Sequence, residues 1–376
     1  MLKYPLHSQS PVGKGSCSHL AFHGPRILAI GPSPPPELGT SIPFDIMCQF
    51  LRNRFSQLSV IDTNEITRRG AWNWLWSRQA VRTAAAIFVA DLILLAVSRP
   101  KIYLLGSWLV IFGALFGKRV VLRSFGGDLD EYYRLGGFLH RTAIRIMLHA
   151  DVVFLETHHQ ITFAKRLRPK ANIVWLANFR ILKQVRMAGS DDPQLADVWP
   201  APPRLRLIFI GHVSREKGVD VLCDAMELCS DLASLVLCGD LIDADLAHCI
   251  ERIGAMHVGR VDNEYAMRLL DAAEVLVCPS NCPTEGHPGV VIEAFMHGTP
   301  VIASDWRSIP EVVTDGSTGL LFESRNARSL AAKIRQMADL ATRDRLAKAA
   351  SSSMIFWDAE HWNDVLIQAV EEALRS

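Results

Sequence analysis

The feature that most constrains the fold is an alternation of short apolar runs with longer amphipathic stretches, and it occurs twice along the chain. Apolar runs of strand length separated by helix-length segments are typical of a parallel α/β sheet. In the first half the predicted strands cover residues 26–31, 59–61, 102–105, 119–123, 151–155 and 172–176. In the second half they cover residues 205–210, 234–238, 257–258, 275–278, 300–303 and 319–322. The pattern therefore predicts two α/β units of similar size.

Helices are predicted between these strands, and a linker is predicted between the two units. The helices cover residues 42–55, 139–149, 218–229, 264–273, 289–297, 327–346 and 357–374. The linker is rich in proline, glycine and polar residues, which interrupt the alternation. We therefore divide the chain into a flexible lead-in (1–25), a first α/β domain (26–185), the linker (186–203), a second α/β domain (204–350) and a C-terminal segment (351–376) whose helix packs back toward the first domain.

Composition excludes several classes of protein. With 376 residues and 49% apolar content, the chain can bury a large core, and it is neither disordered nor fibrous. None of its eight cysteines forms a CxxC pair, so we interpret them as reduced thiols of a cytoplasmic protein. No metal site is predicted, because His158 and His159 have only Glu156 near them in sequence. We interpret this histidine pair as part of a loop near the ligand cleft or as a surface feature.

A formal net charge of +1 hides a strong asymmetry between the halves. Residues 1–190 carry 24 Lys and Arg against 10 Asp and Glu, a charge of +14. The remaining residues carry 16 against 29, a charge of −13. A basic half indicates an anionic partner such as a membrane surface, a phosphate-bearing lipid or nucleic acid. Nucleic acid is not favoured, because no recognisable binding motif accompanies the basic residues. The alternative is that the two halves simply attract each other.

Two apolar stretches in the first half, residues 83–98 and 102–116, are too short to cross a bilayer, and charged or glycine residues interrupt them. Both are expected to be buried elements. Just upstream, Trp72, Trp74 and Trp76 lie among arginines at positions 68, 69, 78 and 82. Indoles next to arginines are typical of an anchor at the level of lipid headgroups. The alternative is that the three indoles cap the core of the first domain.

The segment with most chemical information is PSNCPTEGHPGVVIEA, residues 279–294. A predicted strand runs into a loop that opens a helix, and the free N–H groups at a helix start attract an anion such as phosphate. Gly286 and Gly289 permit close approach of the backbone to that phosphate. Glu285 and Glu293 would repel phosphate and are better suited to accept hydrogen bonds from hydroxyls. The pattern predicts a diphosphate site with sugar hydroxyls on both sides; the alternative for Glu285 alone is a capping carboxylate.

This segment resembles the E-x7-E motif of glycosyltransferase family 4, the retaining nucleotide-sugar transferases also called glycosyl transferases group 1. Three further blocks, residues 209–218, 294–303 and 309–319, are similar to that family. The similarity covers roughly residues 205–325, and the first domain resembles the family more loosely. The resemblance implies an α/β GT-B fold, in which two facing Rossmann-like domains with parallel sheets form an interdomain cleft. The second domain would hold the donor and the first domain the acceptor.

The resemblance also implies roles for individual residues. Glu293 would bind the ribose hydroxyls, and Glu285 would bind the hydroxyls of the donor sugar. Lys217 would neutralise the diphosphate leaving group, where negative charge develops; its alternative is a solvated lysine at a helix start. The loop backbone would contact the sugar and the diphosphate, and this loop consists of Gly286, His287, Pro288 and Gly289.

The chain departs from the family pattern at His212, where the family usually has an arginine. A protonated His212 or the nearby Arg215 could supply the missing charge, although only arginine binds phosphate in a bidentate manner. In the first domain, Gly39 and Thr40 occupy the place of the family's glycine-rich loop, either as a phosphate contact or as a plain turn. Residues 123–128 follow a predicted strand and point towards the cleft. Many relatives carry a histidine in this neighbourhood, close to the reacting sugar, and residues 123–128 contain none. Asp128 is therefore the candidate contact to the acceptor.

Together these features predict a retaining glycosyltransferase of the hexosyl type that uses a UDP- or GDP-linked sugar as co-substrate and needs no cofactor. Its acceptor would be a lipid-linked glycan of a surface polysaccharide, and the enzyme would lie at the cytoplasmic face of the membrane, held by its basic half. Asp128 and Asp130 have the spacing of a metal motif, but the resemblance implies metal-independent transfer.

Two alternatives belong to the same fold. One is a nucleotide-sugar epimerase, which the E-x7-E block argues against. The other is a catalytically inactive glycosyltransferase-like subunit that binds or activates a partner enzyme. The departure at His212 favours the inactive subunit, whereas the presence of Glu285, Glu293 and Lys217 counts against it. The nucleotide base, the donor sugar, the acceptor, the linkage and the oligomeric state stay open.

Overall fold

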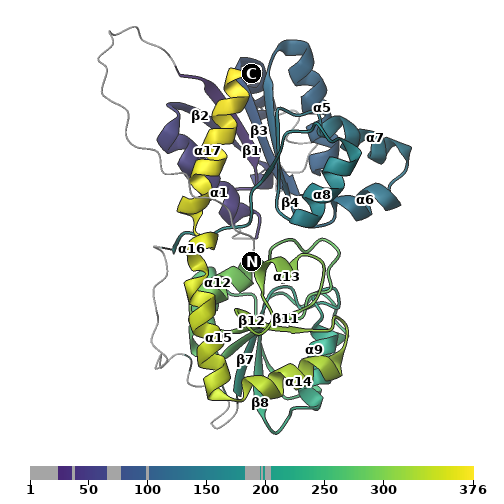
Figure 1. Cartoon of the computed structure of the whole chain (residues 1–376), viewed down its shortest axis with the longest axis vertical. Helices are drawn as coiled ribbons and strands as arrows, with labels where there is room; N and C mark the ends of the chain where they lie inside the picture. Colours follow the sequence, from purple (N-terminus) through teal and green to yellow (C-terminus); the bar gives the residue numbers. More distant parts are fainter. Residues whose placement is uncertain are drawn as a thin grey trace.

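The structure, a computed structural model, describes residues 24–35, 39–65, 78–98, 101–182, 195, 198–199 and 205–376. These residues form two α/β domains, one above the other in Figure 1, each built on a six-stranded parallel sheet. The tryptophan cluster at 72–76, nearly all of the predicted lead-in and most of the predicted linker lie outside the described residues.

The first sheet has the strand order β2-β1-β3-β4-β5-β6. Its central strand β3 is almost continuously apolar, and all residues of β3 except the last are buried, as expected for a parallel sheet with helices on both faces. The strands are β1 (Arg26–Gly31), β2 (Gln57–Asp62), β3 (Leu92–Ser98), β4 (Arg119–Phe125), β5 (Val152–Leu155) and β6 (Ile173–Trp175). The helices are α1 (Ser41–Arg54), α4 (Arg78–Val89), α5 (Lys101–Phe116), α6 (Leu129–Leu135), α7 (Phe138–Met147) and α8 (His158–Leu167).

The second sheet has the strand order β12-β11-β10-β7-β8-β9. Its strands are β7 (Leu205–Ile210), β8 (Ala233–Cys238), β9 (Met256–Gly259), β10 (Val275–Cys278), β11 (Val301–Ser304) and β12 (Gly319–Phe322). Its helices are α9 (Val219–Glu227), α10 (Leu246–Arg252), α11 (Asn263–Ala272), α12 (Gly289–Met296), α13 (Ile309–Val312), α14 (Ala327–Met337) and α15 (Leu340–Ser352). This is the Rossmann order, in which the chain reverses its direction across the sheet between β7 and β10.

Such a reversal opens a crevice at the carboxyl ends of the two central strands, where open α/β sheets bind ligands. Strand β7 leads into residues 211–218, and strand β10 leads into residues 279–288. Both segments that carry the predicted donor residues therefore lie at the same edge of the second sheet. In the first sheet β1 and β3 are the corresponding neighbours, and the loop after β1 contains Gly39 and Thr40.

The last helices return the chain to the first domain. After α16 (Met354–Trp357), helix α17 (Ala359–Arg375) packs against α1 and β4, and Figure 1 shows it in yellow beside α1. Its Leu366 and Val370 are buried in that contact. The segment in which the chain leaves the first domain contacts the segment in which it returns. The N–H of Arg180 donates to Trp357 O at 3.0 Å, and the carbonyl of Arg180 accepts from Ala359 N at 2.8 Å.

The strand predicted at residues 102–105 is wrong, because these residues form the first turn of α5. The strand of this region is β3, at the end of the apolar stretch 83–98. Helix α5 is apolar on nearly all sides, so it lacks the 3.6-residue period that identifies a helix, and its Ile and Tyr favour strands. Gly113 lets the helix lie close to the following turn, since a Cβ there would be 2.7 Å from Lys118 O.

The single helix predicted at residues 327–346 is also wrong, because it consists of two helices, α14 and α15. Asp339 begins the second one: its side chain accepts a hydrogen bond from Thr342 N at 2.9 Å, as a helix-capping aspartate does. Among the residues that the structure describes, no helix combines the length and the apolar character that a membrane span needs.

We predict that Gly239→Ala destabilises the second domain more than Gly254→Ala does. Gly239 follows β8 with φ +141°, and an added Cβ would lie 1.9 Å from Gly211 O, so the ends of β7 and β8 would have to separate. Gly254 has φ +63° with open space around it. The expected loss in the free energy of unfolding is about 2 kcal/mol or more for Gly239→Ala and about 1 kcal/mol for the control. Urea unfolding measures both, and equal losses would contradict the close approach.

Candidate functional site

The loop between β10 and α12 carries both glutamates of the predicted donor site. Glu285 lies within the loop, and Glu293 lies one turn into α12, which begins at Gly289. The residue before the helix is Pro288, and no side chain caps the helix start. The amino end of α12 therefore presents backbone N–H groups at the carboxyl edge of the second sheet.

Lys217 and Glu285 form a direct ion pair, with Lys217 Nζ 2.7 Å from Glu285 Oε2. Ser280 Oγ donates to the same carboxylate oxygen. Gly218 makes the pairing possible: it has φ +74°, and a Cβ there would lie 2.1 Å from Pro279 O. Burial of the ammonium group opposes its charge, but the Glu285 carboxylate outweighs that effect and raises the pKa of Lys217. Lys217 is therefore a fixed cation at neutral pH.

Glu293 pairs with an arginine of the preceding domain that the sequence analysis does not single out. Arg180 Nε donates to Glu293 Oε1 at 2.7 Å, and both side chains are largely buried. Arg180 Nη1 also donates to Asn178 Oδ1 at 3.0 Å. Gly289 leaves room for this guanidinium, since a Cβ there would lie 1.9 Å from Arg180 Nη2. The glycine predicted to approach a phosphate thus also allows an interdomain contact.

A buried carboxylate of the first domain holds the loop from the other side. Glu156 Oε1 accepts a hydrogen bond from His287 N at 2.6 Å, and Glu156 Oε2 lies 3.8 Å from Arg123 Nη2. Arg123 is fully buried, and burial lowers its pKa to about 10, so it remains charged at neutral pH. Gly286 gives Glu156 access to the loop, because a Cβ there would lie 2.5 Å from Glu156 Oε1.

The segment that follows β4 lies directly against Glu285. Gly127 N donates to Thr284 O at 3.0 Å, and a Cβ on Gly127 would lie 2.1 Å from Glu285 O. Asp128, the candidate acceptor contact, comes next in the chain; it is buried and precedes α6. The structure therefore brings the predicted acceptor segment and the predicted donor loop together.

Two further interdomain contacts surround the loop. Glu311 of α13 accepts from His287 Nε2 at 3.1 Å and from His158 N at 3.0 Å at the start of α8. Arg307 donates to Glu131 Oε2 at 2.9 Å and to Asp130. Neither Glu311 nor Arg307 is found by sequence reasoning, because their partners in the first domain lie more than a hundred positions away in the sequence.

The residues considered as metal ligands in the sequence, Asp130, His158 and His159, take part in these interdomain contacts. Asp130 is paired with Arg307 and Arg134, and His159 Nε2 lies 3.1 Å from it. His158 is held through its backbone by Glu311. Within the described part of the chain, no cluster of histidine, cysteine, aspartate and glutamate is arranged to hold a metal ion.

The remaining predicted residues are His212, Arg215, Gly39 and Thr40. His212 is exposed. The Arg215 guanidinium is also exposed and pairs with Asp245, and with Asp220 at 3.5 Å. Two carboxylates thus neutralise the arginine that could have replaced the missing phosphate ligand. Gly39 has open space around it, and Thr40 is the residue before α1.

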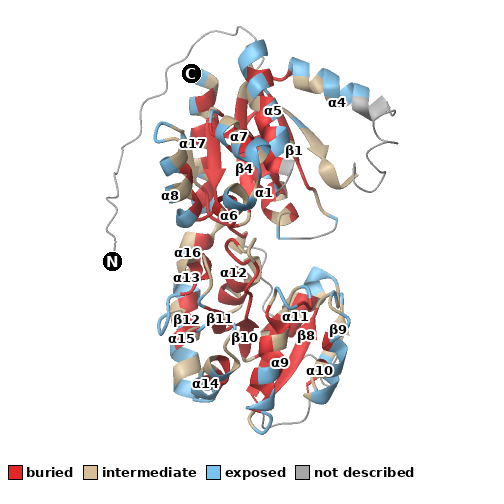
Figure 2. Ribbon diagram, turned by 90° about the vertical axis from the view of Figure 1, so that its right-hand side faces the viewer, coloured by how far each residue is buried: buried red, intermediate tan, exposed pale blue. Residues whose placement is uncertain are grey.

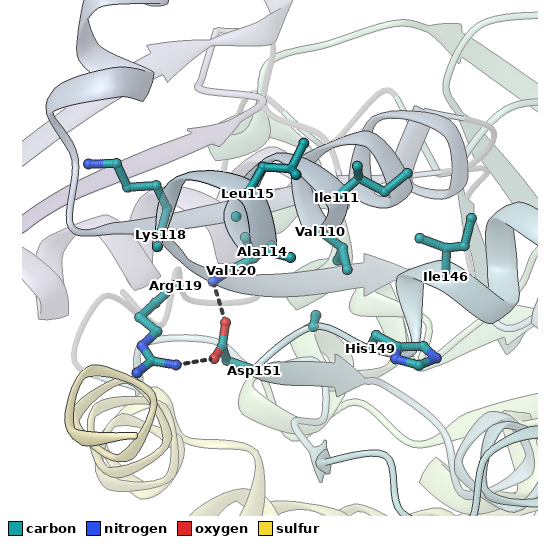
Figure 3. A pocket seen from close by; sticks show the side chains of 13 residues that line it. Val110, Ile111, Ala114, Leu115, Lys118, Arg119, Val120, Ile146, His149 and Asp151 are labelled. Carbon is teal, nitrogen blue, oxygen red and sulfur yellow. Dashed lines mark hydrogen bonds and ion pairs between the residues drawn. The ribbon is translucent and has the colours of Figure 1, made fainter.

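A large cavity of about 650 Å³ lies elsewhere, between the ends of α5 and α7. Its lining includes Arg119 and Asp151, which are joined by an ion pair in Figure 3. These residues stand at the amino ends of β4 and β5, whereas the loop with Glu285 faces the carboxyl ends. The cavity is therefore separate from the candidate donor site.

We predict that Glu311→Gln lowers the free energy of unfolding at neutral pH by about 1–3 kcal/mol. Burial raises the pKa of Glu311, but hydrogen bonds from His287 and from His158 N outweigh it and hold the pKa below its usual value of 4.5. The unfolded state therefore takes up the proton first as the pH falls, so the stabilisation is present above about pH 4.5 and is lost below it. The free energies of unfolding of the wild type and the variant, measured with urea, should become equal as the pH is lowered. A difference that persists in acid would contradict the ionic role.

Comparisons with known proteins bear on the family and the fold of this chain. The family described as Glycosyl transferases group 1 matches residues 204–339. An uncharacterized 41.2 kDa protein in the cps region of Klebsiella pneumoniae is 32% identical over 127 residues, 33% of this chain and 34% of that protein. The putative teichuronic acid biosynthesis glycosyltransferase TuaC of Bacillus subtilis is 28% identical over 219 residues, 57% of this chain and 54% of TuaC. Alpha-maltose-1-phosphate synthase of Mycolicibacterium smegmatis is 33% identical over 35% of this chain and 37% of the synthase.

The matches thus span about a third to a half of the length of these curated relatives. Among solved structures, Anabaena HepE in complex with UDP and glucose aligns with a TM-score of 0.73 at 16% identity, over 92% of this chain and 99% of HepE. Sucrose-phosphate synthase from Thermosynechococcus elongatus aligns with a TM-score of 0.69 at 17% identity, over 92% of this chain and 98% of the synthase. The chain therefore has the GT-B fold, and its residues 204–339 are similar to the glycosyl transferases group 1 family.

Proposed function

We propose that the protein is a retaining glycosyltransferase that moves a sugar from a nucleoside diphosphate sugar to a lipid-linked glycan during synthesis of a surface polysaccharide. The observation that carries this proposal is the Lys217–Glu285 pair, which lies at the carboxyl edge of the second sheet beside the uncapped start of α12. A fixed cation, hydroxyl-binding carboxylates and free N–H groups are the three elements that a donor of this kind requires. The relatives named for the cps region and for teichuronic acid biosynthesis support the polysaccharide context.

The donor would lie along the loop between Glu285 and Glu293. Glu293 would accept hydrogen bonds from the ribose hydroxyls, and Arg180, which already holds one of its oxygens, would keep the other oriented. Glu285 would bind the hydroxyls of the transferred sugar. The HepE complexes with UDP and with UDP-glucose support a nucleotide-sugar donor and make uridine the first base to test.

In the proposed reaction, the bond between the anomeric carbon and the diphosphate oxygen breaks while the acceptor hydroxyl attacks from the same face. Lys217 would stabilise the negative charge that develops on the departing diphosphate, since its raised pKa keeps it protonated. The acceptor proton would pass to an oxygen of the leaving diphosphate, so the step needs no cofactor or metal. Asp128, next to the loop of Glu285, would contact the acceptor.

The acceptor side explains the proposed location. A lipid-linked glycan reaches the enzyme only at a membrane surface, so we place the enzyme at the cytoplasmic face of the membrane with its basic half toward anionic lipid. One observation supports the second candidate, an inactive binding or activating subunit. The family usually has an arginine at the position of His212, and Arg215 does not replace it, because its charge is paired with the surface carboxylates Asp220 and Asp245.

Nucleotide binding is the first test. In calorimetric titrations, UDP or GDP should bind in the micromolar range, and Glu293→Ala should weaken this binding by at least about tenfold, because a hydroxyl-binding carboxylate is removed. Glu264→Ala, which removes an exposed glutamate of α11 in the same domain, is the matched control and should bind as the wild type does. Absence of binding to every nucleotide would reject the donor site and favour the inactive subunit.

Transfer activity separates Lys217 from Arg215. We expect Lys217→Ala to lower the rate of donor turnover by about 10²–10³-fold, the cost of removing one preorganised charge from a leaving group. Arg215→Ala should lower it far less, because this exposed guanidinium pairs with Asp245 and Asp220 at the protein surface, whereas Lys217 pairs with Glu285 inside the donor loop. Release of free nucleotide from the donor sugar reports both variants. A loss for Arg215→Ala that equals the loss for Lys217→Ala would contradict the assignment.

A further inference from the structure

The turn between α6 and α7 exposes an unusual amount of apolar surface. The exposed fractions of Leu135, Phe138 and Leu139 are 80%, 81% and 77%. Phe138 and Leu135 are the two most exposed large apolar side chains among the described residues. We refer to residues 135–139 as the apolar tip. Single exposed apolar residues are normal on soluble proteins, but three within five positions indicate a surface that something covers.

The apolar tip is held rigidly by the two helices beneath it. Arg141 of α7 donates to Tyr133 O at 3.1 Å and to Arg134 O at 3.0 Å, and so satisfies carbonyls at the end of α6. Gly136 lies so close to the backbone that a Cβ there would be 2.7 Å from Tyr132 O. The exposed side chains are therefore presented by a tight, hydrogen-bonded turn.

Helix α5 extends the apolar surface along the same side of the first domain. Residues 102–117 contain no charged side chain. The prediction that residues 102–116 form a buried element is wrong for part of this helix, because several of its large apolar residues are exposed: Leu104, Leu105, Trp108, Ile111, Leu115 and Phe116. Helix α5 packs on α6 and α7 through Tyr103, which contacts Tyr132, and Ser107, which donates to Ala143 O at 2.6 Å. Figure 2, which views the molecule from the right-hand side of Figure 1, shows α5, α6 and α7 together on the near side.

Cations border this surface. Arg134, Arg141 and Arg145 are exposed on α6 and α7, and Lys118 follows the end of α5. Figure 3 shows Lys118 at one side of the cavity between α5 and α7, with Leu115 and Ile111 along its wall. The neighbouring carboxylates Asp130, Glu131 and Asp151 are each paired with an arginine. The border of the apolar surface is therefore positive, within a half of the chain that carries a charge of +14.

The apolar tip stands close to the candidate site. Helix α6 connects the two: it begins after Asp128, beside the loop of Glu285, and ends at Leu135. Its seven residues span only about 10 Å at 1.5 Å per residue. An object seated on the tip would thus lie about 10 Å from Asp128, the proposed contact to the acceptor.

We propose that the apolar tip and the exposed face of α5 form a docking surface for an anionic phospholipid bilayer. Apolar side chains would enter the headgroup region while Arg141, Arg145 and Lys118 meet lipid phosphates. A second copy of this chain fits less well, because a twofold contact would bring these cations together. That the docked bilayer delivers the acceptor rests on the proposed function; the docking itself does not.

Sedimentation of the full chain with vesicles tests the docking surface. One set of vesicles contains phosphatidylcholine alone, and the other contains equal parts of phosphatidylcholine and phosphatidylglycerol. The wild type should bind the anionic vesicles, and added salt should weaken the binding. The triple variant Leu135→Ser/Phe138→Ser/Leu139→Ser should bind them at least about tenfold less, because three apolar side chains no longer enter the interface.

A matched triple variant in the second domain, Leu228→Ser/Ile242→Ser/Leu340→Ser, removes exposed apolar residues outside this surface and should bind as the wild type does. Thermal unfolding and nucleotide titration of both variants report folding and the donor site independently of lipid. Vesicle binding without nucleotide binding would reject the proposed function and leave the docking surface standing.

Three outcomes would overturn the docking surface. One is equal vesicle binding by the wild type and the tip variant. Another is a wild-type dimer, measured by light scattering, that the tip variant abolishes without any effect on vesicle binding. The last is loss of binding only when Trp72, Trp74 and Trp76 are replaced by serine, which would assign the anchor to the tryptophan cluster.

Discussion

The carboxylate of Glu156 is the contact on which the geometry of the site depends. It is only 4% exposed, and it connects Arg123 in the core of the first domain to the backbone N–H of His287 in the second. A buried carboxylate without compensation costs several kcal/mol, so both partners and the small residue Gly286 are required around it. The loop that carries Glu285 is consequently shaped by both domains, and Asn178, Arg180, Glu311 and Arg307 reinforce the same arrangement.

Sequence reasoning finds the parts of this site that follow one another along the chain. Glu285, Glu293 and the glycines between them belong to one strand–loop–helix unit, and Lys217 follows the strand next to it, so strand order alone brings them together. The interdomain partners could not be found in this way, because no local period relates Arg180 to Glu293 or Arg307 to Asp130. Helix α5 was missed for a different reason: it is apolar on nearly all sides, and a helix of this kind has no polar face to mark its period.

The charge asymmetry of the sequence has more than one expression in the structure. Arg180 of the basic half pairs with Glu293 of the acidic half, as simple attraction between the halves would predict. Arg307 and Asp130 pair in the opposite sense, with the cation on the acidic half. Attraction between the domains is therefore achieved through a few buried pairs, whereas exposed arginines such as Arg145 stay on the outer surface of the first domain.

The return of α17 to the first domain affects the order in which the molecule can assemble. Leu366 and Val370 are buried beside α1, yet the ribosome adds them only after it has made the whole second domain. The second sheet and its helices form one continuous stretch of sequence, from β7 to α15, so this unit has all of its parts first. The strands of the first domain are synthesised earlier, but the apolar surface over α1 stays uncovered until α17 has been synthesised. During that interval it is the half of the protein that needs protection from aggregation.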